Sequence, residues 1–263
     1  MTRENLPDYM KVGNGETTIY LLHGGYGSKA YWAPVIERYS RQGLRVIAWD
    51  APGYGISELP DKLAIVGMAK AAADLIDATG TRNNVVLGHS MGGLIAPLVA
   101  NMRKDAVQGI ILSATVSSFG HLDDKTRREF IAERVKPLDD GLSMKDVAGP
   151  LIRSMMGKNA DSEDARRVIS ETSSTPDATF RAAIAAIVSY DADPALAELA
   201  APTLIIAGEV DPIGKVDNLK ALHDQLEGSE FCVVPGCGHY AWAEDPETYD
   251  AAVLPFVRRV TRT

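Results

Sequence analysis

VVLGHSMGG, residues 85–93, is the stretch of sequence that decides the fold. Its first three residues, Val85–Leu87, are apolar and predict a strand. The run Leu94–Val99, which follows the stretch, predicts a helix. Between them stands the pattern G-x-S-x-G, in the strand–turn–helix setting in which it presents a serine nucleophile. Side chains next to that serine would collide with the neighbouring strand and helix, and glycines avoid this at Gly88, Gly92 and Gly93. We therefore predict that Ser90 is a nucleophile, with the helix N-terminus facing the charge that develops during attack.

A second glycine-rich turn, HGGYG at residues 23–27, follows the β-rich run Thr17–Leu22. Tetrahedral intermediates of acyl transfer carry an oxyanion, which is usually held by two backbone N–H groups. We expect one donor at Met91, directly after the nucleophile, and the other at Gly25, with Tyr26 as its rival. His23 is expected to brace this loop by hydrogen bonding.

The general base should be a histidine on a loop at the carboxyl edge of the sheet, where open α/β sheets bind their ligands. His239 meets this condition, because PGCGH at residues 235–239 follows the predicted strand Glu230–Val234. His89 adjoins Ser90, so its side chain should point away from the serine. His223 lies in the middle of a predicted helix and is expected at the surface. His121 opens an insertion, where it is expected in solvent, with a position lining a pocket as the alternative.

The residue that orients the base should be a carboxylate after another strand. GEVDP at residues 208–212 follows the predicted strand Pro202–Ala207, and Asp211 is the best candidate in it. Glu209 and Asp217 are the alternatives. The chain order serine, aspartate, histidine agrees with the order associated with this nucleophile turn.

Strand-like and helix-like runs alternate through the first half of the chain, which predicts a mostly parallel sheet. The predicted strands are Thr17–Leu22, Arg45–Asp50, Asn84–Leu87 and Gln108–Ser113, and the predicted helices are Tyr31–Gln42, Leu63–Thr79 and Ser90–Arg103. Strands return at Pro202–Ala207 and Glu230–Val234, before a last helix at Pro246–Val260.

Between these two halves only helical patterns are found, so we predict a core of residues 1–115 and 200–263 and a helical insertion of residues 116–199. The helices expected in the insertion are His121–Val135, Met144–Met156, Glu163–Thr172 and Ala178–Tyr190. They are rich in charged residues, as expected for helices solvated on one face.

The chain has 263 residues, a formal net charge of -8 and an isoelectric point of about 5.2. An acidic surface repels phosphate backbones and anionic lipids, so we expect neither nucleic acid nor membrane partners. The two cysteines, Cys232 and Cys237, exclude a disulfide framework, and no signal peptide is visible, so a cytoplasmic location is expected. Cys237 lies two residues before His239 and is a much weaker candidate nucleophile than Ser90.

Together these motifs resemble the α/β-hydrolase fold superfamily from about Thr17 to Val260. The segments that carry the resemblance are HGGYG, DAPGYGIS, GHSMGG, GEVD and GCGH, which begin at His23, Asp50, Gly88, Gly208 and Gly236. The resemblance implies helices on both faces of the sheet and a four-helix cap inserted between the sixth and seventh core strands. The short N-terminus departs from the pattern and implies a reduced hairpin at the sheet edge.

Within the superfamily the chain is similar to small cap-bearing esterases and to the 3-oxoadipate enol-lactonase group. The HGG and SMGG elements also resemble carbon–carbon bond hydrolases. We therefore expect hydrolysis of a small carboxylic ester or lactone without metal or cofactor. The alternatives are carbon–carbon hydrolysis or another non-ester reaction on the same scaffold, such as perhydrolysis, a lyase step or a cofactor-free oxygenase step, and a non-catalytic receptor.

The cap should select a small-molecule substrate, but its sequence does not say how. Tyr26 and Trp242 are the expected substrate-binding residues, and other large side chains could line the pocket, namely Trp32, Met155, Met156 and Tyr190. One of the seven arginines of the insertion could also clamp a substrate carboxylate: Arg127, Arg128, Arg134, Arg153, Arg166, Arg167 or Arg181.

Overall fold

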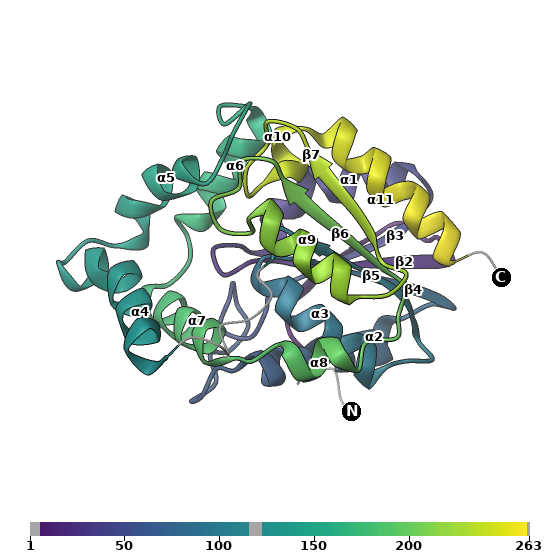
Figure 1. Cartoon of the computed structure of the whole chain (residues 1–263), viewed down its shortest axis with the longest axis horizontal. Helices are drawn as coiled ribbons and strands as arrows, with labels where there is room; N and C mark the ends of the chain where they lie inside the picture. The colour runs from purple at the N-terminus through teal and green to yellow at the C-terminus, as the bar shows by residue number, and fades with distance from the viewer. Residues whose placement is uncertain (1–5, 116–122, 262–263) are drawn as a thin grey trace.

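A seven-stranded sheet forms the centre of the protein in the computed structural model, which describes residues 6–115 and 123–261 (Figure 1). The strand order is β1-β3-β2-β4-β5-β6-β7, and every pair is parallel except β1 with β3. The strands are β1 Tyr9–Val12, β2 Thr17–Leu22, β3 Arg45–Trp49, β4 Asn83–His89, β5 Val107–Ser113, β6 Thr203–Gly208 and β7 Glu230–Val234.

Side chains alternate between the two faces of the sheet and feed two separate hydrophobic cores. On β2, Tyr20 and Leu22 belong to one core while Ile19 and Leu21 belong to the other. The first core is closed by α2 (Ile65–Thr79), α3 (Met91–Met102) and α9 (Val216–Gln225), and the second by α1 (Ala33–Arg41) and α11 (Pro246–Val260). The predicted fold class, a parallel sheet with helices on both faces, is therefore confirmed.

Five helices lie between β5 and β6 in the described part of the chain, and the last of them, α8 (Asp193–Ala197), is short. The four longer ones are α4 (Asp124–Asp139), α5 (Met144–Ser154), α6 (Glu163–Thr172) and α7 (Asp177–Ser189). Figure 1 shows them together on one side of the sheet, in teal and green. We refer to α4–α7 as the cap. The predicted helix His121–Val135 begins outside the described residues, as does His121 itself, and the division into core and cap domains stays a prediction.

Several short elements were not predicted. The strand β1 pairs antiparallel with β3 and is the outermost strand on that side of the sheet. Within residues 6–115 and 123–261, no second strand pairs with it. The others are the 3-10 helix η2 (Lys29–Trp32), α8 (Asp193–Ala197) and α10 (Ala241–Glu244). No helix in the described part of the chain is both long and apolar enough to cross a membrane.

Candidate active site

Ser90 lies on the sharp turn between β4 and α3, with backbone angles φ 53° and ψ −114°. A non-glycine residue with positive φ is uncommon and costs conformational energy, so surrounding contacts must hold it. The Ser90 N–H donates to Ser113 O at 2.9 Å, and the chain packs tightly on both sides of the turn. A Cβ atom at Gly88 would lie 2.1 Å from Gly92 O, and one at Gly92 would lie 2.2 Å from Leu22 O. The predicted reason for these glycines is thus borne out.

His239 and Asp211 form a buried pair on the loops that follow β7 and β6. His239 Nδ1 lies 2.8 Å from Asp211 Oδ2, and Asp211 Oδ1 accepts a hydrogen bond from the Ile213 N–H at 2.7 Å. Because the carboxylate accepts from Nδ1, the other ring nitrogen, Nε2, is left free to exchange a proton.

The two alternative acids lie elsewhere. Glu209 is exposed and accepts a hydrogen bond from the Gly236 N–H at 2.7 Å, which ties two loops together. Asp217 is exposed in the first turn of α9. Of the three candidate acids, Asp211 is the buried one in contact with His239.

Ser90 and His239 line the same cavity, beneath the cap. No hydrogen bond joins Ser90 Oγ to His239 within the described residues. Hydrogen bonds between catalytic residues are often long in the free enzyme and shorten when substrate binds, so this geometry agrees with a catalytic pair.

The loop after β2 lies against the nucleophile. A Cβ atom at Gly24 would lie 3.0 Å from Ser90 Cβ. The Gly24 N–H is occupied, because it donates to Tyr31 Oη at 2.9 Å. The backbone N–H groups of Gly25 and Tyr26 have no partner among the described residues, so both remain available as oxyanion donors beside Met91.

His23 braces this loop, as the sequence predicted. Its Nδ1 lies 2.8 Å from Gly24 O, and its Nε2 accepts from the Ala51 N–H at 3.0 Å. These partners require the neutral ring with its proton on Nδ1. Burial lowers the pKa of His23 to about 4, which keeps it neutral.

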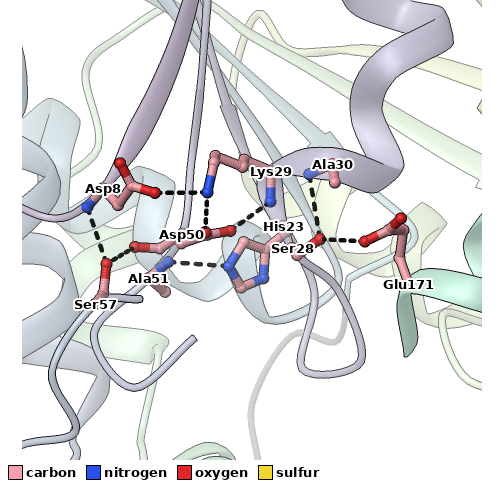
Figure 2. A network of polar contacts seen from close by, with 9 residues as sticks. All are labelled: Asp8, His23, Ser28, Lys29, Ala30, Asp50, Ala51, Ser57 and Glu171. Carbon is pink, nitrogen blue, oxygen red and sulfur yellow. Dashed lines mark hydrogen bonds and ion pairs between the residues drawn. The ribbon is translucent and has the colours of Figure 1, made fainter. Parts of the chain in front are cut away.

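A polar network behind the loop joins it to the turn after β3 (Figure 2). The Lys29 N–H donates to Asp50 Oδ1 at 2.7 Å, and Lys29 Nζ forms ion pairs with Asp50 and with Asp8. On the cap side, Ser28 Oγ donates to Glu171 Oε2 at 3.4 Å. The loop is therefore fastened to the core on one side and to α6 on the other.

A chain of hydrogen bonds connects this loop to the backbone of His239. Tyr31 Oη lies 3.0 Å from His89 Nδ1, and His89 Nε2 lies 2.9 Å from His239 O. A carbonyl can only accept, so His89 Nε2 carries the proton and Nδ1 accepts from Tyr31. Both ring nitrogens of His89 are thus engaged away from the Ser90 hydroxyl, and burial lowers its pKa well below the ordinary histidine value.

Glu244 holds the loop that carries His239, a role that the sequence did not suggest. Its buried carboxylate accepts hydrogen bonds from the N–H groups of Gly157, Gly238 and Tyr240 at 2.6 to 3.2 Å. Burial raises the pKa of Glu244. The sequence shows a glutamate five residues after the predicted base, but this spacing alone does not reveal that its carboxylate binds the backbone of the His239 loop.

The cavity is small, with a volume of about 50 Å³, and mostly apolar. Besides Ser90 and His239, it is lined by Tyr26, Met91, Leu94, Phe130, Arg134, Met155, Ile184, Ile187 and Ile213. Tyr26 lies where a substrate-binding residue was expected. Trp242 does not, and this expectation is wrong: it is fully buried, with its ring centroid 4.7 Å from Trp32 and 5.1 Å from Tyr31.

Cys237 is also unsuited to catalysis. It is buried, and burial raises its pKa to about 12, so the reactive thiolate is disfavoured. Within residues 6–115 and 123–261, no group of three or more His, Cys, Asp or Glu residues is arranged to hold a metal ion.

Comparison with known proteins shows the family of this chain. The family model for the alpha/beta hydrolase fold matches residues 17–246. The chain is 28% identical to a candidate carbamate hydrolase, RutD, of Variovorax paradoxus, with 96% of both chains covered. It is 26% identical to a 2-hydroxy-6-oxo-6-(2'-aminophenyl)hexa-2,4-dienoic acid hydrolase of Metapseudomonas resinovorans, over 95% of this chain and 87% of that one.

Solved structures include close matches to the whole fold. A thermophilic esterase from Thermogutta terrifontis superimposes with a TM-score of 0.83 at 25% identity, covering 97% of this chain and 94% of the esterase.

Proposed function

Because this chain belongs to the α/β-hydrolase fold family and is a hydrolase, we propose that it cleaves a small carboxylic ester or lactone through an acyl-enzyme on Ser90. One observation carries the proposal. Ser90, on a strained turn, and His239, which is paired with the buried Asp211, line the same cavity, and the three residues follow three separate strands.

In the proposed reaction His239 Nε2 removes the Ser90 proton as Ser90 Oγ attacks the carbonyl carbon. The N–H groups of Met91 and Gly25 stabilise the oxyanion, with Tyr26 as the alternative second donor. His239 then protonates the leaving group, and the acyl group remains on Ser90. Water, activated by His239, attacks the acyl-enzyme and restores the free serine.

Asp211 is the orienting residue in this scheme. It accepts from Nδ1, which fixes the ring and stabilises the positive charge that His239 carries between the two proton transfers. The reaction needs no metal or organic cofactor, because every proton and charge is handled by these side chains and backbone groups. A small-molecule substrate is the proposed partner, and two cysteines without a disulfide support a cytoplasmic location.

Carbon–carbon bond hydrolysis is the second candidate, since the Metapseudomonas resinovorans relative carries the name of a dienoic acid hydrolase. The two candidates are separated by kcat/KM for short esters and lactones against a vinylogous 1,5-diketone, measured on one preparation. We expect the esters and lactones to react faster. A diketone that reacts orders of magnitude faster would replace the first candidate by the second.

A non-catalytic receptor is separated from both by covalent labelling with a fluorophosphonate, which requires an activated serine. We expect labelling of the wild-type protein and none of Ser90→Ala. An unlabelled wild-type protein would contradict both hydrolase candidates.

A further inference from the structure

Arg134 brings a positive charge to an otherwise apolar part of the cavity. It lies on α4, in the cap (Figure 1), and is half-buried. Apart from Arg134 and His239, the lining side chains are uncharged, and none of them is acidic. Any charged group that enters the cavity beside Ser90 therefore meets this guanidinium.

The guanidinium of Arg134 has no carboxylate partner within the described residues. Its Nη1 donates to Phe130 O at 3.3 Å, and its Cζ lies 3.2 Å from the centre of the Phe130 ring. Residues 116–122 contain neither aspartate nor glutamate, so they supply no counter-ion. Glu133 acts on Arg134 through its charge but forms no ion pair with it.

Other arginines of the cap behave differently. Arg153 forms an ion pair with Asp161, and Arg181 forms one with Asp139. Arg128, Arg166 and Arg167 form no ion pair within the described residues, but they are exposed to water. Arg134 differs from them because it is half-buried and lines the cavity, and burial lowers its pKa.

Keeping a cation partly buried without a counter-ion is costly unless a partner arrives. An arginine has five N–H donors, and one of them is used here. The guanidinium lies over the Phe130 ring, and its other N–H groups have no partner among the described residues, so they are available for bidentate recognition of a carboxylate. Arginine remains charged despite the burial, because its ordinary pKa is far above neutral.

We propose that Arg134 binds a carboxylate of the substrate, so that the substrate is a short ester or lactone with an anionic group near the scissile carbonyl. This inference rests on the proposed function, because it takes the Ser90 cavity to be the substrate site. The small cavity favours a compact molecule whose carboxylate is a few bonds from the reacting carbon.

The test compares two esters of matched shape. Monomethyl succinate carries a terminal carboxylate, and methyl 4-methylpentanoate carries an uncharged isopropyl group in its place. We expect the wild-type protein to prefer the anionic ester in kcat/KM by about tenfold or more, the range of a charged hydrogen bond. In Arg134→Gln this ratio should fall to about one, and Arg134→Lys should restore part of it.

Arg153→Gln is the matched control, because Arg153 is an exposed cap arginine outside the cavity, and it should keep the wild-type ratio. A wild-type ratio near one, or a ratio that Arg134→Gln leaves unchanged, overturns the inference. Circular dichroism and thermal melting show whether the Arg134 variants are folded.

A binding measurement separates this inference from the proposed function. Calorimetry with monomethyl succinate is done on Ser90→Ala, which cannot turn the ester over, and on Ser90→Ala/Arg134→Gln. We expect binding to weaken about tenfold or more in the double variant. If the wild-type protein hydrolyses neither ester, the proposed function fails, and the calorimetry alone then decides about Arg134. Weaker binding to the double variant supports Arg134 as the anion site. Equal binding to both variants overturns the inference.

Discussion

At the scale of the residue, His239 is held at three separate points. Its Nδ1 contacts Asp211, its N–H donates to Met155 O at 2.7 Å, and its carbonyl accepts from His89. The contact with Met155 comes from the loop that follows α5, so the cap also helps to place the base. Such preorganisation matters because proton transfer demands a defined ring orientation.

The first prediction concerns Asp211. We expect Asp211→Asn to lower kcat by a factor on the order of 10⁴ while the protein stays folded, because the amide favours the wrong orientation and tautomer of His239. Steady-state kinetics on a short ester measure the loss. Asp217→Asn is the control and should keep wild-type kcat, since Asp217 is exposed on α9. The opposite result for the two variants would contradict the assignment of the acid.

The second prediction concerns the buried neutral ring of His23. Its pKa is lowered to about 4, so the unfolded chain binds a proton there at a higher pH than the folded protein does. The contribution of neutral His23 to the free energy of unfolding is therefore fully present above pH 6.5 and is lost as the pH falls toward 4. The free energy of unfolding should fall by about 3 kcal/mol over this range. Urea unfolding from pH 8 to pH 4.5 should show this decline, with a shallower slope in His23→Asn. Equal slopes in both proteins would refute the explanation.

The candidate catalytic residues were predictable because each follows a strand within a short, distinctive segment. The environment of Trp242 was not, because a tryptophan near the base could face either the cavity or the second core. The choice was made by packing against Trp32 and Tyr31, residues more than 200 positions away in the chain. For Arg134 likewise, the sequence offered seven cap arginines, and only tertiary structure shows which one reaches the cavity.

At the scale of the element, the turn between β4 and α3 depends on close backbone packing. Gly92, in the first turn of α3, approaches β2 so closely that a Cβ atom would lie 2.2 Å from Leu22 O. Strand and helix must separate to accept any side chain there, and this would move Ser90 as well.

The third prediction follows from that contact. We expect Gly92→Ala to lower the free energy of unfolding by about 3 kcal/mol and to reduce activity. Gly67→Ala is the control, because Gly67 is exposed on α2 with no atom within 4 Å of its Cβ position. It should raise stability by about 0.5 to 1 kcal/mol through helix propensity. Denaturant unfolding of both variants tests the pair, and a stable, active Gly92→Ala protein would contradict it.

The longer elements matched their predictions closely, because their hydrophobic periods run over many residues. The helices Glu163–Thr172 and Pro246–Val260 have the predicted bounds. Short elements were predicted where an unbroken run of apolar residues marks them, as in the five-residue strand β7, and β1 and α8 were missed because they contain no run of that length. The strand β1 owes its existence to pairing with β3, which the sequence of Tyr9–Val12 does not reveal.

At the scale of the whole molecule, the cavity exists only because cap and core meet. The core supplies Ser90, Met91 and His239, while α7 supplies Ile184 and Ile187 from the opposite side. A Cβ atom at Gly25 would lie 3.3 Å from Ile187 Cδ1, so this side chain closes directly over the loop after β2. The cap should therefore limit the length of the acyl group.

The fourth prediction tests that limit. Ile187→Ala should enlarge the cavity and raise kcat/KM for p-nitrophenyl hexanoate relative to p-nitrophenyl acetate by about tenfold, since each methylene in an apolar pocket is worth about 1 to 3 kcal/mol. Ile56→Ala removes an exposed side chain and should leave the ratio unchanged. An unaltered ratio in Ile187→Ala would mean that α7 does not bound the acyl site.

The most direct test of the central claim is to find the acyl group on Ser90. The protein is mixed with p-nitrophenyl acetate, quenched in acid within the first turnovers, digested and analysed by mass spectrometry. The account predicts an acetyl group on the peptide that contains Ser90, accumulating when deacylation is the slower step, and neither acetyl group nor turnover in Ser90→Ala. An acetyl group on a different catalytic residue, or turnover that persists in Ser90→Ala, would contradict it.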